Sequence, residues 1–195
     1  IHKVAIINAL VQDTNKTALL LASDEAEAQR ICQDLASMGL RSFIYPTRDF
    51  TFRNVESASR EYEHQRIQVL SRILKHDCDV VIACMDAALQ YTIPPNELEG
   101  RMIELKKGQT VSLEQVVQSL VRCGYVRAEQ IFTPDAPYPV RIEFWGDEID
   151  TMGLFDLESQ RRTETVDSVM LAPSVEVLVD NPSELADKIT STLLL

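Results

Sequence analysis

Cys78-Asp79-Val80-Val81-Ile82-Ala83-Cys84 is a short and almost uninterrupted apolar run. A run of this kind is typical of a parallel strand that is buried on both faces of its sheet. Two more strand candidates, at residues 17–22 and 41–46, precede it, and helical patterns at residues 23–39 and 58–75 lie between the three. The alternation of strand, helix, strand, helix and strand predicts an α/β domain with a parallel sheet.

The two helical patterns carry different signals: the first has clear signals at its ends, and the second has an apolar stripe with charged residues beside it. In the first, Ser23 is the predicted N-cap, and Gly39 supplies the left-handed residue that ends the helix. The second has an apolar stripe from Ile67 to Leu74. Its charged residues are expected to form solvent-exposed pairs: Arg60, Glu61, Glu63 and Arg66.

The pattern changes at Pro94-Pro95, where two prolines end the alternation. Beyond them a helix is predicted at residues 113–122, beginning with a capping box formed by Ser112 and Gln115. Residues 140–145 and 148–155 predict a β-hairpin, because both alternate and Gly146 can supply the positive φ of a tight turn. Short strands are also predicted at residues 101–105, 168–172 and 175–179, and a helix from Asn181. We therefore predict domains at residues 1–92 and 93–174, and a return segment at residues 175–195.

The composition restricts the classes of function. Thirty acidic and nineteen basic residues among 195 give a net charge of −11, which argues against a surface built to neutralise DNA phosphates. The apolar runs are far shorter than the roughly 20 residues that a membrane-spanning helix needs. The four cysteines lack C-x-x-C spacing, which favours reduced thiols in a cytoplasmic protein. The chain starts at Ile1, and residues 1–14 contain neither a basic leader nor a small-residue cleavage site, so we expect it to be part of a longer protein.

The chain offers no motif for catalysis or for a cofactor. Asn15-Lys16-Thr17 lacks the glycines that a phosphate-binding loop needs, because backbone amides must face the phosphates. The three histidines are far apart and have no nearby ligands at metal spacing. We expect a protein without enzymatic activity, cofactor or metal.

One strand carries a distinctive set of side chains on each face. The alternation places one set in the core: Val140, Ile142 and Phe144. The other face holds a guanidinium, a carboxylate and an indole: Arg141, Glu143 and Trp145. Arginine and aromatic residues dominate the energies of protein interfaces, so this face suits protein recognition. The alternative is a cross-strand salt bridge beside a partly covered tryptophan, and the spacing alone does not decide between them.

Several segments resemble a known family. They are Arg48-Asp49-Phe50-Thr51-Phe52, Ser59-Arg60-Glu61-Tyr62-Glu63-His64-Gln65-Arg66, Pro137-Tyr138-Pro139-Val140-Arg141-Ile142-Glu143-Phe144-Trp145-Gly146-Asp147-Glu148-Ile149-Asp150, Leu154-Phe155-Asp156 and Ser159-Gln160-Arg161. Together they resemble the N-terminal, UvrB-like module of bacterial transcription-repair coupling factors (Mfd). The resemblance covers nearly the whole chain and is weakest before Gly39. UvrB proteins share the motif of the second unit, but they carry a tyrosine-rich, DNA-engaging hairpin after the position of Pro46 that this chain lacks.

The resemblance implies a first domain with a helicase-like fold of the degenerate P-loop NTPase type, without a working nucleotide site. It implies an inserted α+β domain that binds UvrA, so that a repair complex is delivered to stalled RNA polymerase. The ATP-dependent translocase and the regions that contact RNA polymerase and DNA would lie outside this chain. Two alternatives stay open: a fragment of UvrB, and a module that binds DNA directly.

The resemblance also implies which residues contact UvrA. Arg127 lies where the family has an interface arginine, and Arg141 with Glu143 matches a later Arg-x-Glu pair. The family has a glycine- and arginine-rich hairpin after the position of Gln130, which this sequence does not contain. We expect Arg127, Arg141 and Glu143 to form the UvrA-binding site.

Overall fold

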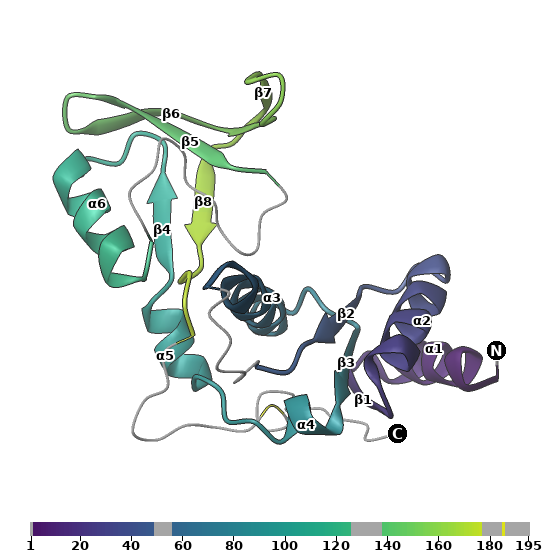
Figure 1. The fold of residues 1–195 in the computed structure, drawn as a ribbon. Helices are drawn as coiled ribbons and strands as arrows, with labels where there is room; N and C mark the ends of the chain where they lie inside the picture. Colours follow the sequence, from purple (N-terminus) through teal and green to yellow (C-terminus); the bar gives the residue numbers. More distant parts are fainter. Residues whose placement is uncertain (1, 49–55, 126–137, 177–184, 186–195) are drawn as a thin grey trace. The chain divides into compact units, whose positions relative to one another are not determined.

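The computed structural model describes residues 2–48, 56–125, 138–176 and 185 (Figure 1). The chain forms two compact units. The first unit contains Ile1–Glu97 and the C-terminal segment Glu176–Leu195, and the second contains Leu98–Val175. The domain boundaries inferred from the sequence, at residues 93 and 175, stay a prediction.

A three-stranded parallel sheet organises the first unit. It consists of β1 (Ala18–Ala22), β2 (Ser42–Tyr45) and β3 (Val80–Cys84) in the order β1-β3-β2. The central β3 is the apolar run that predicted the sheet, and its residues from Val80 to Ala83 are all fully buried. The predicted parallel sheet is confirmed, and its assignment as helicase-like stays a prediction.

Among the described residues, four helices lie wholly within this unit. They are α1 (His2–Thr14), α2 (Glu25–Ser37), α3 (Glu56–Leu74) and the short α4 (Met85–Ala88). The apolar side chains of α1 and α2 pack with β1 and β3 in one core cluster, while α3 lies on the other side of the sheet (Figure 1). The helices predicted at residues 23–39 and 58–75 are confirmed as α2 and α3.

The start of α2 differs from the prediction. Its N-cap is Asp24 instead of Ser23, and the Asp24 carboxylate accepts a hydrogen bond of 2.7 Å from the backbone N–H of Glu27. Ser23 instead donates its backbone N–H and hydroxyl to the Glu27 carboxylate. At the other end Gly39 has φ of +86°, so the predicted left-handed stop is confirmed.

The second unit combines one long helix with two antiparallel sheets. In the first sheet, β4 (Ile103–Lys106) pairs with β8 (Ser168–Leu171). In the second, β5 (Val140–Trp145), β6 (Glu148–Phe155) and β7 (Arg162–Thr165) lie in that order. The strand β7 was not predicted from the sequence, because its four residues are polar and exposed and carry no apolar alternation. The short helices α4 and α5 (Pro95–Gly100) were not predicted either.

The helix α6 (Leu113–Arg122) covers the core of this unit. Its predicted limits and its capping box are confirmed, with Ser112 accepting from the Gln115 backbone and the Gln115 side chain accepting from Ser112. Val116 and Leu120 of α6 pack with apolar residues of β4, β5, β6 and β8. The mixed α/β architecture, with both parallel and antiparallel sheets, is therefore established.

Some sequence predictions lie outside the described residues. They concern the helix from Asn181, most of the strand at 175–179, Arg127 and the region around Gln130. Across the described part of the chain, none of the helices has the length and apolar character required to cross a membrane.

Candidate protein-binding face

The outer side of the β5-β6-β7 sheet presents a cluster of charged and aromatic side chains. We call it the hairpin face, and it consists of Arg141, Glu143, Trp145, Thr151, Phe155 and Arg162. The opposite side of β5 faces the core, where Val140 is 1% exposed and Ile142 and Phe144 pack against the buried cluster. The predicted division of β5 into two faces is confirmed.

The guanidinium of Arg141 lies over an aromatic ring. Its guanidinium carbon is 3.9 Å from the ring centroid of Phe155, which is 6% exposed. Its Nη2 donates a 3.2 Å hydrogen bond to the side-chain oxygen of Gln160, whose own amide donates to the carbonyl of Leu157. These contacts hold the guanidinium at the surface in one orientation.

Glu143 is held by two groups from neighbouring strands. The hydroxyl of Thr151 on β6 donates a 2.7 Å hydrogen bond to one carboxylate oxygen. Arg162 on β7 places its Nη2 3.4 Å from the other oxygen. The hydrogen bond from Thr151 lowers the pKa of the Glu143 carboxyl, and the positive charges of Arg162 and Arg141 lower it further. Glu143 therefore pairs with Arg162 of β7.

Trp145 ends β5 next to the hairpin turn. It is 83% exposed, the largest exposed fraction among the large apolar side chains of the described residues. The turn that follows has φ of +63° at Gly146, as predicted. The alternative of a partly covered tryptophan is therefore wrong, although a salt bridge between strands is present. An exposed indole on the same face as an ordered guanidinium is typical of a protein-binding surface.

Arg127 lies outside the described residues, but the chain just before it is fixed. Gly124 has φ of +88°, and a Cβ there would lie 2.5 Å from a methyl group of Val175. The hydroxyl of Tyr125 donates to the carbonyl of Ala172. Of the three predicted site residues, the structure describes Arg141 and Glu143 on one face, and their role stays a prediction.

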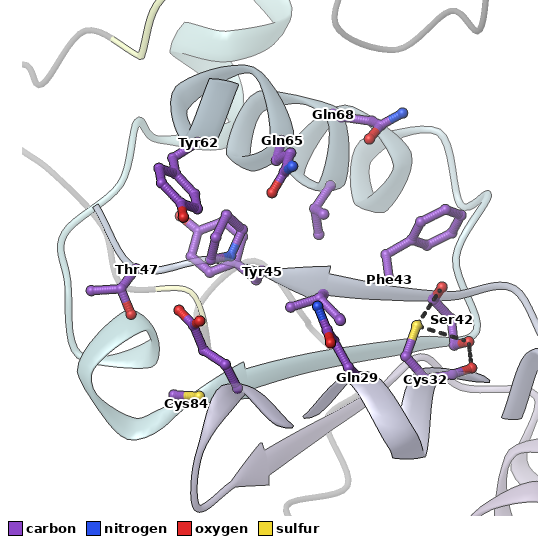
Figure 2. Close-up of a pocket in the computed structure, with 14 residues that line it drawn as sticks. Gln29, Cys32, Ser42, Phe43, Tyr45, Thr47, Tyr62, Gln65, Gln68 and Cys84 are labelled. Atoms are coloured by element: carbon purple, nitrogen blue, oxygen red, sulfur yellow. Dashed lines mark hydrogen bonds between the residues drawn. The ribbon is translucent and has the colours of Figure 1, made fainter. Parts of the chain in front are cut away.

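A hollow in the first unit, between α2 and α3 beside β2, is a second candidate site (Figure 2). It has a volume of about 550 Å³ and lies near the carboxyl ends of β2 and β3. Its polar lining is mostly uncharged and includes Gln29, Gln65, Gln68 and Tyr62. The thiol of Cys32 contacts the hydroxyl and donates to the carbonyl of Ser42 at one end. Glu25 is the one charged residue among its described lining groups, so the hollow offers nothing on the described chain to neutralise a phosphate.

Within the described ranges, no cluster of three or more histidine, cysteine or carboxylate side chains has the geometry to hold a metal ion. The four cysteines are free thiols. Burial raises the pKa of Cys78 to about 12, so this thiol stays protonated at neutral pH and packs as a core side chain. The hairpin face is therefore the strongest candidate site.

One comparison with known proteins concerns the part of the chain that forms the hairpin face. A family described as the UvrB interaction domain matches residues 130–176, which include β5, β6, β7 and β8. The chain is 28% identical to the transcription-repair-coupling factor of Bacillus subtilis over 207 residues, which cover 95% of this chain and 17% of that protein.

Two more relatives carry the same name. The Escherichia coli protein is 28% identical over 130 residues, covering 59% of this chain and 11% of that protein. The protein of Staphylococcus aureus strain USA300 is 21% identical over 193 residues, covering 91% of this chain and 16% of that protein. The chain thus spans less than a fifth of the length of these relatives. The resemblance to bacterial transcription-repair-coupling factors, which the sequence motifs indicated, is therefore confirmed along most of this chain.

Proposed function

We propose that this chain acts in transcription-repair coupling as a non-catalytic module that binds UvrA through the hairpin face. One observation carries the proposal: the segment similar to the UvrB interaction domain contains an ordered guanidinium and an almost fully exposed indole on one surface. RNA polymerase and DNA would be contacted by other parts of a longer protein. The site of action would be the bacterial cytoplasm.

The geometry of Arg141 suits a carboxylate on the partner. Phe155 and Gln160 restrict its side chain, so less conformational entropy is lost when the guanidinium binds. Among the described residues Arg141 has no carboxylate within salt-bridge distance, while Glu143 is paired with Arg162. Its positive charge would form charge-assisted, two-point hydrogen bonds with an acidic residue of UvrA, and Trp145 would supply apolar contact area.

Calorimetric titration of this chain with UvrA tests the proposal. Arg141→Ala should weaken binding by at least ten-fold, because truncating one side of a buried charged contact typically costs roughly 2–5 kcal/mol. Arg30→Ala is the matched control, since it removes the same charge from the exposed side of α2 in the first unit. Equal affinities for the parent and for a folded Arg141→Ala variant would exclude Arg141 from the interface.

The other two predicted site residues are tested in the same titration. Arg127→Ala should weaken binding if the family's interface arginine is retained at this position. Glu143→Gln keeps an oxygen that can accept from Thr151 but removes the charge that pairs with Arg162. A loss of affinity on Arg127→Ala, with the circular dichroism spectrum unchanged, would place that residue in the contact.

The proposal also includes the absence of catalysis and of direct DNA binding. We expect no ATP hydrolysis by this chain, with or without DNA. A net charge of −11 opposes contact with phosphates, so we expect little DNA binding even at low salt. Measurable ATP turnover, or an affinity for DNA that falls steeply with ionic strength, would favour the UvrB-fragment or DNA-binding alternative.

A further inference from the structure

Arg162 reaches the hairpin face from β7, the strand that the sequence did not reveal. Its side chain lies against Gly153 of the central strand β6: a Cβ added to Gly153 would lie 3.0 Å from both Cδ and Nε of Arg162. In the sheet register Gly153 is opposite Arg141 on β5 and opposite Thr165 on β7. The absence of a side chain at Gly153 therefore leaves room for Arg162 to cross β6 toward β5.

At the end of this path Arg162 completes a three-residue network. Its Nη2 is 3.2 Å from the hydroxyl of Thr151, to which it donates, and 3.4 Å from one oxygen of Glu143. Thr151 in turn donates to the second oxygen of Glu143 at 2.7 Å. Both carboxylate oxygens thus have partners on the side of Glu143 that faces β6 and β7.

Without this network Glu143 would have another cation within reach. Arg141 and Glu143 are two residues apart on the same face of β5, which separates their Cα atoms by roughly 7 Å. Two long side chains of opposite charge can meet across that distance, and at a partly exposed surface their attraction is appreciable. A guanidinium already paired with Glu143 would have to break that contact before it could bind a carboxylate of a partner.

We propose that Arg162 is a positioning residue of the hairpin face: it holds Glu143 toward β6 and β7, and so keeps the Arg141 guanidinium available to an acidic group of the partner. This inference rests on the proposed function. Arg162 does not need to touch the partner for this role. The two arginines have different tasks, although both guanidinium groups lie over the ring of Phe155, at 3.9 and 5.5 Å.

A double-mutant cycle with UvrA separates this role from a direct contact. Arg162→Ala should weaken binding by about ten-fold in the parent, within the range of coupling between residues of one network. In a Glu143→Gln background the same substitution should change affinity by less than about two-fold, because the neutral amide no longer competes for Arg141. Arg162→Lys should retain part of the affinity, and Arg161→Ala controls for the loss of one positive charge at the adjacent position.

A second measurement does not require UvrA. The ¹⁵N resonance of the Arg141 Nε group is followed by NMR while pH is lowered through the titration of Glu143. In the parent it should respond weakly, whereas in Arg162→Ala it should follow the Glu143 titration, because the two side chains then pair.

The outcomes distinguish the two proposals. If Arg141→Ala loses binding while Arg162→Ala does not, the positioning role is wrong and UvrA binding by this face stands. Equal losses in both backgrounds would mean that Arg162 contacts UvrA directly, which also overturns positioning. If the parent does not bind UvrA, the proposed function fails, and the NMR titration still decides whether Arg162 separates Glu143 from Arg141.

Discussion

Arg66 illustrates how far a single side chain can depart from its sequence context. It was expected to form solvent-exposed pairs on α3, but it is fully buried, and this prediction is wrong. Its Nε is 2.8 Å from Glu176, its Nη1 donates to the carbonyl of Pro46, and its guanidinium lies 4.3 Å from the ring centroid of Tyr45. The signal was present, because Arg66 lies four residues before Leu70 in line with the apolar stripe of the helix.

The carboxylate of Glu176 binds several segments of the first unit at once. One oxygen accepts from Arg66 and is 2.6 Å from Nη2 of Arg48, and the other accepts from the backbone N–H of Ile93. Ile93 lies shortly before the chain enters the second unit, and Glu176 is the residue at which the chain returns from it. The ion pair therefore ties the outgoing and returning chain to α3.

Arg66→Met should destabilise the first unit by about 3–5 kcal/mol, because it leaves a buried carboxylate with one cation fewer and removes its hydrogen bonds. Urea unfolding followed by circular dichroism measures the change. Arg72→Met is the matched control on the same helix: Arg72 also lies over an aromatic ring, that of Phe43, and pairs with Asp77, but its side chain is 24% exposed. A cost of less than about 1 kcal/mol is expected there, and equal costs at both positions would contradict the special role of burial.

Gly153 is a second residue whose identity is restricted by its immediate neighbours, because there is no room for a side chain. A Cβ at this position would lie 2.7 Å from the carbonyl oxygen of Glu164, a backbone atom that cannot move without displacing β7. Gly153→Ala should therefore cost about 1–3 kcal/mol in the free energy of unfolding, as overpacked sites do. Gly100→Ala is the control, because the space around Gly100 is open and its φ is not positive. An unchanged unfolding midpoint for Gly153→Ala would show that β7 shifts without cost.

At the scale of elements, the start of α2 has two candidate N-caps: Asp24 in the structure and Ser23 in the sequence prediction. Asp24 satisfies the backbone N–H of Glu27, so Asp24→Ala should destabilise the first unit by about 1 kcal/mol. Ser23→Ala removes only the exposed hydroxyl contact to Glu27 and should cost a few tenths of that amount. Urea midpoints of the two variants provide the comparison, and a larger effect at Ser23 would restore the sequence-based assignment.

Regular elements were predictable where the local pattern was strong. The limits of α6, β5 and β6 agree with the sequence prediction, because each of these elements ends at a strong local signal: a capping box at the start of α6 and a glycine turn between β5 and β6. The strand β7 has no such signal, because it is exposed along its whole length and, among the described strands, pairs with β6 alone. Because β7 supplies Arg162, the sequence also did not reveal this residue of the hairpin face.

For the molecule as a whole, acid should destabilise both units. The hydrogen bond from Arg41 lowers the pKa of Asp79 in the first unit, and hydrogen bonds from Ser159 lower that of Asp156 in the second. A carboxyl whose pKa is lower in the folded state stabilises the fold above its unfolded pKa of about 4. That contribution is lost as pH falls through the lowered folded value. We therefore expect stability to decrease below about pH 4.

Asp79→Asn and Arg41→Met should each flatten this acid-dependent loss for the first unit, because either substitution removes the Arg41–Asp79 ion pair that includes a 3.1 Å bond from Nε. Urea unfolding at a series of pH values checks this. The double variant should be no less stable than the sum of the single effects predicts, since one interaction is removed twice. A pH profile identical to that of the parent in both single variants would show that Asp79 does not contribute.

The sequence by itself determined the alternation of strands and helices, the buried central strand, the hairpin and the two faces of β5. These features follow from side-chain periodicity and turn chemistry, which act over a few neighbouring residues. The tertiary structure alone decided the partners of the charged groups: Arg66 pairs with Glu176 across 110 residues, and Glu143 pairs with Arg162 across the width of a sheet. Such pairings depend on which segments the topology brings together, and charges carry no periodic signal that identifies a distant partner.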